Sequence, residues 1–213
     1  MNIIEEIRKR KIVAIVRGVK SDDMISLADA LTEGGITLIE VTFDQRSKEG
    51  IQETMKSLSR IKEERGGRVI LGAGTVLTAE QVELAARGGA EYIITPNVNR
   101  SVIERAKEMG MSVMSGALTP TEIEDAYRTG ADIVKLFPAG SLGVSYLKAV
   151  RGPLSHIPVS AVGGIDERNM RAFFDAGACA VGIGGNLIDR QAIAERKFGR
   201  ITGTARRLTA LLK

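Results

Sequence analysis

Short apolar runs alternate with longer amphipathic stretches along the whole chain. The runs are rich in β-branched residues and are bounded by glycine, proline and polar residues, which is typical of buried strands. Eight runs fit this description: KIVAIVRG (11–18), LIEVTF (38–43), RVILGAGT (68–75), YIITP (92–96), SVMSGA (112–117), DIVKLF (132–137), PVSAVGG (158–164) and CAVGIGG (179–185). Between them lie helical patterns such as TAEQVELAARGGA and NRSVIERAKEMG. The chain is therefore predicted to form eight strands that alternate with helices.

The ends of the helical stretches repeat the same residue types. The stretches begin with Ser, Thr, Asn or Asp, which favour helix N-caps, and end in glycine, which favours the C-terminal end. The terminating glycines are Gly34, Gly66, Gly88, Gly110, Gly130 and Gly177. Strands that alternate with helices favour a parallel sheet, and eight such units favour a closed (β/α)8 barrel. A doubly wound open sheet is the alternative, but no G-x-G-x-x-G fingerprint follows the first run.

The composition indicates one globular domain that spans residues 1–213. Hydrophobic residues make up 44% and charged residues 26% of the chain, and no linker interrupts the pattern. The net charge of +4 favours anionic small molecules, but the chain lacks the dense basic stripe of a nucleic-acid-binding protein. No apolar run reaches transmembrane length, and the segment MNIIEEIRKRK has no signal-peptide core. We therefore expect a cytoplasmic protein that binds neither nucleic acid nor membranes.

Cysteine and histidine each occur once, as Cys179 and His156. This excludes an intramolecular disulfide and a metal site made of several Cys or His ligands, so we expect no metal. Cys179 lies in the small apolar run AGACAVGIG, which favours a buried core thiol. His156 lies in the turn-like segment GPLSHIP, which favours a solvated or capping role.

Lys135 lies in the middle of DIVKLF, where alternation places Ile133, Lys135 and Phe137 on one face of the strand. A charged amine in an apolar strand is costly. Burial favours the neutral amine, which is the form that attacks a carbonyl carbon. Because every strand of a barrel is central, we predict that Lys135 is a nucleophile. The alternative is an edge-strand lysine whose amine reaches water.

Glu40 interrupts the run LIEVTF in the same way and shares a strand face with Thr42. A carboxylate at this place needs a partner, and an inward-facing lysine from another strand would provide one. An amine nucleophile and a carboxyl acid/base together supply the proton transfers of a Schiff-base cycle. A structural ion pair in the barrel core is the alternative.

Glycine pairs follow the last two runs: Gly163–Gly164 precedes DERNM, and Gly184–Gly185 precedes Asn186. In phosphate-binding barrels, the loops after strands seven and eight present backbone N–H groups to the anion. Glycine also ends many strands for steric reasons, so each pair alone is weak evidence for an anion site. Their position after the seventh and eighth runs strengthens that evidence. Arg17, at the end of the first run, is a candidate second anion contact, with a surface arginine as the alternative.

At these residues the chain resembles the KDPG/KHG aldolase family, the 2-keto-3-deoxy-6-phosphogluconate and 4-hydroxy-2-oxoglutarate aldolases. The matching segments occur in order along nearly the whole chain: IVAIVRG, GGITLIEVTF, GAGTVL, YIITPN, GALTPTE, VKLFPA, AVGGI and VGIGGNL. The resemblance implies a class I aldolase that cleaves a 2-keto acid to pyruvate and either glyceraldehyde 3-phosphate or glyoxylate. It also implies a homotrimer that needs no metal or organic cofactor.

The resemblance further assigns roles to single residues. Lys135 would be the Schiff-base lysine and Glu40 the general acid/base. The substrate-binding residues would be Thr75 at the pyruvyl carboxylate, Pro96 and Phe137 along the pocket, and Gly163, Gly164, Gly185 and Asn186 at the distal phosphate or carboxylate.

Two segments depart from the family pattern. Where well-known members carry an arginine four residues after the glutamate, this chain has Asp44, with Arg46 two residues later. Arg17 or Arg46 would then bind the carboxylate, or the substrate is anchored differently. Val162 and Asn186 stand where the family commonly has hydroxyl residues, so fewer hydroxyl donors surround the distal anion. A phosphate-binding barrel isomerase or epimerase and a non-catalytic sugar-acid-binding relative are the competing hypotheses.

Overall fold

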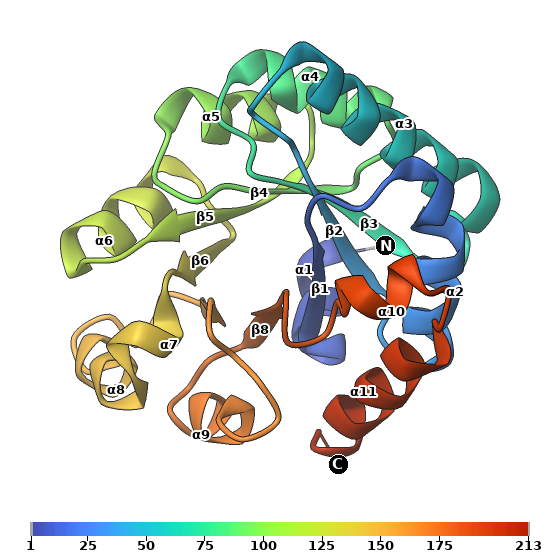
Figure 1. Cartoon of the computed structure of the whole chain (residues 1–213). Helices are drawn as coiled ribbons and strands as arrows, with labels where there is room; N and C mark the ends of the chain where they lie inside the picture. Colours follow the sequence, from blue (N-terminus) through green and yellow to red (C-terminus); the bar gives the residue numbers. More distant parts are fainter. Residues whose placement is uncertain (1, 213) are drawn as a thin grey trace.

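The computed structural model describes residues 2–212 and shows a closed barrel of eight parallel strands (Figure 1). The strands are β1 (Ile12–Val16), β2 (Leu38–Thr42), β3 (Ile70–Gly74), β4 (Tyr92–Ile94), β5 (Ser112–Ala117), β6 (Ile133–Leu136), β7 (Val159–Val162) and β8 (Ala180–Ile183). Each lies within one of the eight apolar runs. Because β8 pairs with β1, the sheet has no edges. The (β/α)8 prediction is confirmed, and the open-sheet alternative is excluded.

Helices cover the barrel, most of them around its outside and α1 at its N-terminal end (Figure 1). They are α1 (Ile3–Arg10), the short 3-10 helix η1 (Ser21–Asp23), α2 (Met24–Glu33), α3 (Lys48–Arg65), α4 (Ala79–Arg87), α5 (Arg100–Glu108), α6 (Pro120–Thr129), α7 (Ala139–Leu142), α8 (Val144–Arg151), α9 (Met170–Asp175), α10 (Arg190–Ala194) and α11 (Gly199–Ala210). The side chains of Ser47, Thr78, Asn99 and Thr119 accept hydrogen bonds from the first turns of α3 to α6. These contacts confirm the expected N-caps for α3 to α6 and leave fewer helix N–H groups without partners. At α2 and α9 the N-cap residues, Asp23 and Asn169, make no such side-chain bond.

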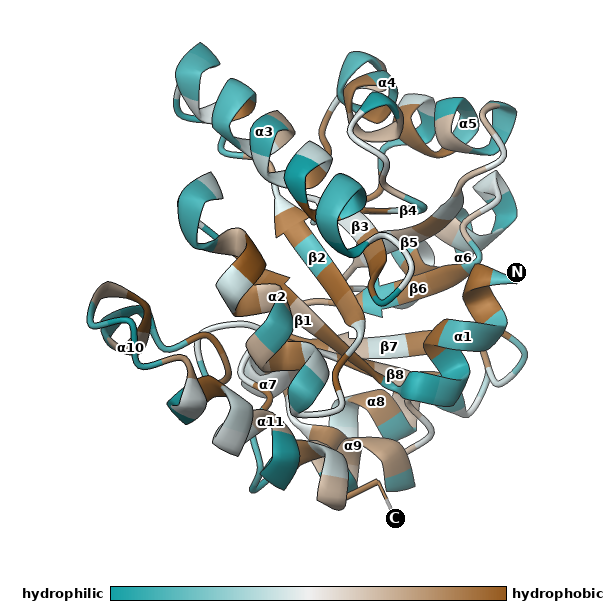
Figure 2. Cartoon of the chain, turned by 90° about the vertical axis from the view of Figure 1, so that its right-hand side faces the viewer, coloured by the Kyte–Doolittle hydropathy of each residue, from teal (hydrophilic) through white to brown (hydrophobic). Residues whose placement is uncertain are grey.

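The alternation of side chains along each strand separates two apolar layers. Ile39 and Val41 of β2 point outward and belong to the same apolar cluster as Leu27 of α2 and Leu58 of α3. Burial of each such side chain stabilises the fold by roughly 1.5–3 kcal/mol. The strands are largely hydrophobic, whereas the helices carry hydrophilic residues on their outer faces (Figure 2). Within residues 2–212, none of the helices combines the length and apolar character needed to cross a membrane.

Helix α1 covers the N-terminal end of the barrel. Its Ile7 is completely buried in a cluster with inward-facing strand residues such as Val13 and Ile133. Cys179 packs against this cluster but is only partly buried, so the expectation of a buried core thiol holds only in part. It precedes β8 at the barrel end, where fewer neighbours cover it. His156 is exposed, as the turn-like sequence around it suggested.

Small residues inside the barrel make room for large polar side chains. A Cβ atom at Gly72 would overlap the Tyr92 ring, and one at Gly74 would overlap the Glu40 carboxylate. Neither glycine has a left-handed backbone, so it is the absent side chain that the structure requires here. Gly72 therefore leaves the space that the Tyr92 ring occupies, and Gly74 leaves the space that the Glu40 carboxylate occupies.

Candidate active site

A cavity of about 300 Å³ opens at the C-terminal ends of the barrel strands, where barrel enzymes place their active sites. Lys135 lies in its wall. All the substrate-binding residues predicted from the sequence line it too: Arg17, Thr75, Pro96, Phe137, Gly163, Gly164, Gly185 and Asn186. The fold thus gathers residues from the two halves of the chain around one lysine.

Lys135 lies in the barrel interior, and its amine has a lowered pKa. Its side chain is on the inner face of β6, only 6% exposed, and its Nζ atom lies 5.1 Å from the centre of the Phe137 ring. Burial lowers the pKa of Lys135 below its ordinary value of 10.5; the Glu40 carboxylate opposes this shift and the Arg17 guanidinium adds to it. A lowered pKa raises the fraction of neutral, nucleophilic amine at neutral pH.

Glu40 is the carboxyl partner inside the barrel. It lies on the inner face of β2 and is 1% exposed. Burial raises the pKa of Glu40, while the charges of Lys135 and Arg17 act to lower it. A carboxyl group whose pKa is raised toward neutrality can both accept and return a proton during a reaction. Lys135 and Glu40 thus have the properties that an amine nucleophile and its acid/base group require.

Two glycine turns form one side of the cavity. Gly163 and Gly164 follow β7 with φ angles of +91° and +73°, which glycine adopts without strain. Within residues 2–212, the N–H groups of Gly164, Gly185 and Asn186 have no protein acceptor. These free donors lie in the wall of the cavity. They suit an anionic group on the substrate.

The side chain of Asn186 is engaged elsewhere. Its Nδ2 atom donates to the Ile165 carbonyl oxygen at 2.8 Å, which ties the turn after β8 to the turn after β7. Asn186 therefore offers an anion its backbone N–H, and its side chain fixes the distance between the two turns.

Arg17 and Thr75 lie together at another part of the cavity wall. An Arg17 Nη atom donates to Thr75 Oγ1 at 3.3 Å. Thr75 has a φ of +54°, a left-handed conformation that is strained for a β-branched residue. A guanidinium and a hydroxyl that converge in this way can bind a carboxylate.

Sequence reasoning did not identify all of the wall. Ile15 and Ile165 also line the cavity, and nothing distinguishes such apolar residues from core residues in the sequence. Gln45, which contacts Thr75, did carry a signal, because it is a polar residue in the loop directly after a barrel strand.

A second hollow of about 530 Å³ lies at the opposite end of the barrel. Arg8, Lys11, His156 and Cys179 are among its lining residues. It is larger than the cavity at Lys135, but it contains none of the predicted catalytic or substrate-binding residues. Chemistry rather than size therefore identifies the candidate active site.

Known proteins resemble this chain in both sequence and fold. The family model described as KDPG and KHG aldolase matches residues 3–204. The chain belongs to the KDPG and KHG aldolase family. It is 36% identical to the 2-dehydro-3-deoxy-6-phosphogalactonate aldolase of Escherichia coli K12, over 84% of this chain and 85% of that protein. It is 32% identical to the 2-dehydro-3-deoxy-phosphogluconate aldolase of Haemophilus influenzae, over 99% and 97% of the two chains.

Solved structures of aldolases superpose closely on this one. A structure described as native KDPGal matches with a TM-score of 0.84 and 33% identity over 94% of this chain and 93% of its own. The KDPG aldolase of Legionella pneumophila, with pyruvate captured as a covalent carbinolamine intermediate, matches with a TM-score of 0.83 and 25% identity over 92% of each chain. The protein is accordingly a class I aldolase, and therefore a lyase. The isomerase hypothesis is set aside.

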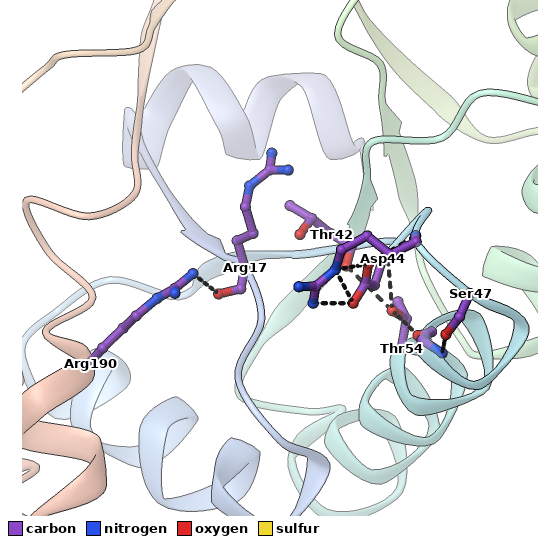
Figure 3. Close-up of polar contacts among 8 residues, drawn as sticks. Arg17, Thr42, Asp44, Ser47, Thr54 and Arg190 are labelled. Atoms are coloured by element: carbon purple, nitrogen blue, oxygen red, sulfur yellow. Dashed lines mark hydrogen bonds and ion pairs between the residues drawn. The ribbon is translucent and has the colours of Figure 1, made fainter.

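Asp44 stands where the family resemblance led us to expect an arginine. Its carboxylate accepts two hydrogen bonds from Arg46 Nε and one from Arg46 Nη2, the latter at 2.6 Å (Figure 3). The Asp44 pKa is lowered to about 2, first by these side-chain hydrogen bonds. Arg46 is thus engaged with Asp44, and its side chain is 84% exposed. It is also absent from the wall of the cavity that contains Lys135.

Arg17 is placed differently from Arg46. Arg190 of α10 donates to the backbone carbonyl of Arg17 at 3.2 Å, while the Arg17 guanidinium points away from Arg190 (Figure 3). The guanidinium of Arg17 therefore remains available to the cavity. Of the two arginines proposed to replace the family residue, the geometry favours Arg17.

Arg17→Ala is expected to raise the KM for the 2-keto acid substrate by about 10- to 100-fold, because it removes a charged hydrogen-bond donor from the carboxylate. Arg46→Ala is the matched control and should change KM by less than about twofold, because exposed ion pairs contribute little. Steady-state cleavage, followed by the pyruvate released, measures both. An equal or larger effect of Arg46→Ala would reject the assignment.

Lys135 should become reactive at a lower pH than an ordinary lysine. Only the neutral amine acylates, so competitive labelling with acetic anhydride and peptide mapping should give a midpoint below 10.5 for Lys135. Arg17→Ala should move this midpoint upward, because the Arg17 charge lowers the Lys135 pKa. Arg46→Ala should leave it unchanged. A wild-type midpoint at or above 10.5 would contradict the proposed electrostatics.

Proposed function

We propose that the enzyme cleaves a 6-phosphorylated 2-keto-3-deoxy sugar acid to pyruvate and glyceraldehyde 3-phosphate, with Lys135 as the Schiff-base residue. The observation that carries the proposal is a buried lysine with a lowered pKa in the wall of a cavity that free backbone N–H donors also line. Glu40, buried on the inner face of β2, has a charge that acts on this lysine and is its acid/base partner. The names of its aldolase relatives fit this substrate class. Cleavage of 4-hydroxy-2-oxoglutarate to pyruvate and glyoxylate would use the same residues.

The reaction begins when the neutral amine of Lys135 attacks C2 of the substrate. The resulting carbinolamine loses water and becomes a protonated imine. Arg17 and Thr75 bind the adjacent carboxylate and keep C2 within reach of the amine. The N–H groups of the two glycine turns bind the distal phosphate. The substrate is then held at both ends.

Glu40 carries out the proton transfers that follow. It accepts the proton of the C4 hydroxyl while the C3–C4 bond breaks, and the electron pair of that bond moves to the imine nitrogen. The aldehyde leaves, and an enamine remains on Lys135. Glu40 returns its proton to C3, water adds to C2, and pyruvate is released with the free amine. One water leaves and one is consumed, so the cycle closes.

The distal group is proposed to be a phosphate because the donors there are backbone N–H groups on two turns. Each N–H makes a directed hydrogen bond, and a phosphate offers several oxygens around one centre. Val162, at the same wall, adds an apolar surface where a hydroxyl would be a further donor. Binding at this end thus depends on the backbone.

We also propose that the enzyme acts in the cytoplasm as a homotrimer, on the strength of the family resemblance. The chain mass is 22.8 kDa, so light scattering should return three times that value in solution. A particle with the mass of one chain would contradict the proposed assembly without affecting the proposed reaction.

Lys135→Ala is expected to abolish cleavage and covalent trapping of pyruvate, because no other buried amine lines the cavity among the described residues. Intact-mass analysis after incubation with pyruvate and sodium borohydride, followed by peptide mapping, should place the adduct on Lys135 of the wild type. Lys148→Ala, an exposed lysine on α8, is the control and should retain both properties. A folded Lys135→Ala protein that still cleaves substrate would overturn the mechanism. A wild type that forms no adduct would favour a non-catalytic role.

A further inference from the structure

Gln45 connects the loop after β2 to the residue after β3. Its Nε2 atom donates to the backbone carbonyl of Thr75 at 2.7 Å and to Gln81 Oε1 at 3.2 Å. In return, Gln81 Nε2 donates to Gln45 Oε1 at 2.8 Å. The two amide side chains thus form a reciprocal pair whose outer donor reaches the Thr75 carbonyl.

Gln81 anchors this pair to the body of the barrel. It lies on α4 and is 5% exposed. Its Oε1 also accepts the backbone N–H of Leu77 at 2.8 Å, and the Leu77 carbonyl accepts from Asn99 at 2.9 Å. The Val76 N–H donates to the Ile94 carbonyl of β4 at 3.3 Å. The backbone from Thr75 to Leu77 is therefore fixed at successive residues.

This fixation explains how Thr75 keeps its strained backbone. A left-handed conformation costs a β-branched residue on the order of 1–3 kcal/mol and persists only where the surroundings enforce it. The conformation directs the Thr75 hydroxyl toward Arg17, which donates to it. Without the hydrogen bond from Gln45, the Thr75 peptide would lose a restraint on the side that faces the β2 loop.

We infer that Gln45 and Gln81 are positioning residues, which hold Thr75, and through its hydroxyl Arg17, in the arrangement that binds the substrate carboxylate. The inference rests on the proposed function, because it assumes that this carboxylate lies at Arg17 and Thr75. Gln45 directly follows Asp44, so the loop that lacks the family arginine contributes to carboxylate binding through a backbone contact. The amide pair thereby favours 2-keto acids over carbonyl compounds without a carboxylate.

A comparison of pyruvate with acetone tests this inference. Acetone carries a methyl group in place of the carboxylate but still forms an imine with a reactive lysine. Trapping with sodium cyanoborohydride, quantified by intact mass, gives the half-saturating concentration of each compound. Gln45→Ala should raise this concentration about tenfold or more for pyruvate, as expected for loss of a hydrogen bond that orders the binding groups. It should change the value for acetone by less than about twofold.

Two further variants test whether the effect comes from the hydrogen bond that Gln45 donates to Thr75. Gln45→Glu keeps the length of the side chain and an oxygen that can accept from Gln81, but it places an acceptor opposite the Thr75 carbonyl, so it should match Gln45→Ala. Gln52→Ala changes an exposed glutamine on α3 and should match the wild type with both compounds. Gln45 is itself exposed, and a thermal unfolding midpoint within a few degrees of wild type confirms that each variant is folded.

The outcomes separate the inference from the proposed function. Wild-type protein that traps neither compound would reject the Schiff-base mechanism itself. Wild-type trapping with unchanged pyruvate saturation in both Gln45 variants would overturn the positioning role alone. An equal loss for pyruvate and acetone would also overturn it, because it would show a general disturbance of Lys135. Selective loss of pyruvate supports the inference.

Discussion

Placing a lysine amine in the interior of a closed barrel has a high free-energy cost when the amine is charged, and the surrounding structure follows from that constraint. Burial lowers the pKa of Lys135 and so raises the fraction of neutral amine, the form that can act as a nucleophile. The Glu40 carboxylate limits the shift, and its own pKa is raised by the same burial. Gly74 leaves the space in which that carboxylate lies. The buried amine of Lys135 thus requires a carboxyl partner, Glu40, and that partner in turn requires a glycine at position 74.

Much of this could be predicted from the sequence because strands have a period of two. The run DIVKLF places Lys135 on the same face as Ile133, which the structure shows inside the barrel, and LIEVTF does the same for Glu40. The closed sheet followed from eight repeated units and was confirmed by the pairing of β8 with β1. The residues that line the cavity could be named because the strand ends of a barrel converge at one face.

Other features depend on contacts between distant segments, which no local pattern encodes. The bond from Gln45 to Thr75 spans 30 residues, and the strained φ of Thr75 exists only because that region is fixed by its neighbours. Asn186 was expected at the distal anion and lies in the cavity wall, but the bond from its side chain to the Ile165 carbonyl could not be predicted from the sequence. Cys179 lies in an apolar run, yet its place at the barrel end leaves it partly exposed. In each case tertiary geometry decides which local preference is realised.

Helix α1 covers the N-terminal end of the barrel, and this has a consequence for the order of events in catalysis. Substrate, aldehyde and water must share the mouth at the C-terminal ends of the strands. In the proposed mechanism the aldehyde is free once the C3–C4 bond breaks, whereas pyruvate stays bonded to Lys135 until water adds to C2. Release is therefore sequential, with pyruvate last. In the interval the enamine is open to a second aldehyde, so the ratio of carbon–carbon bond synthesis to hydrolysis depends on which molecule next enters the mouth.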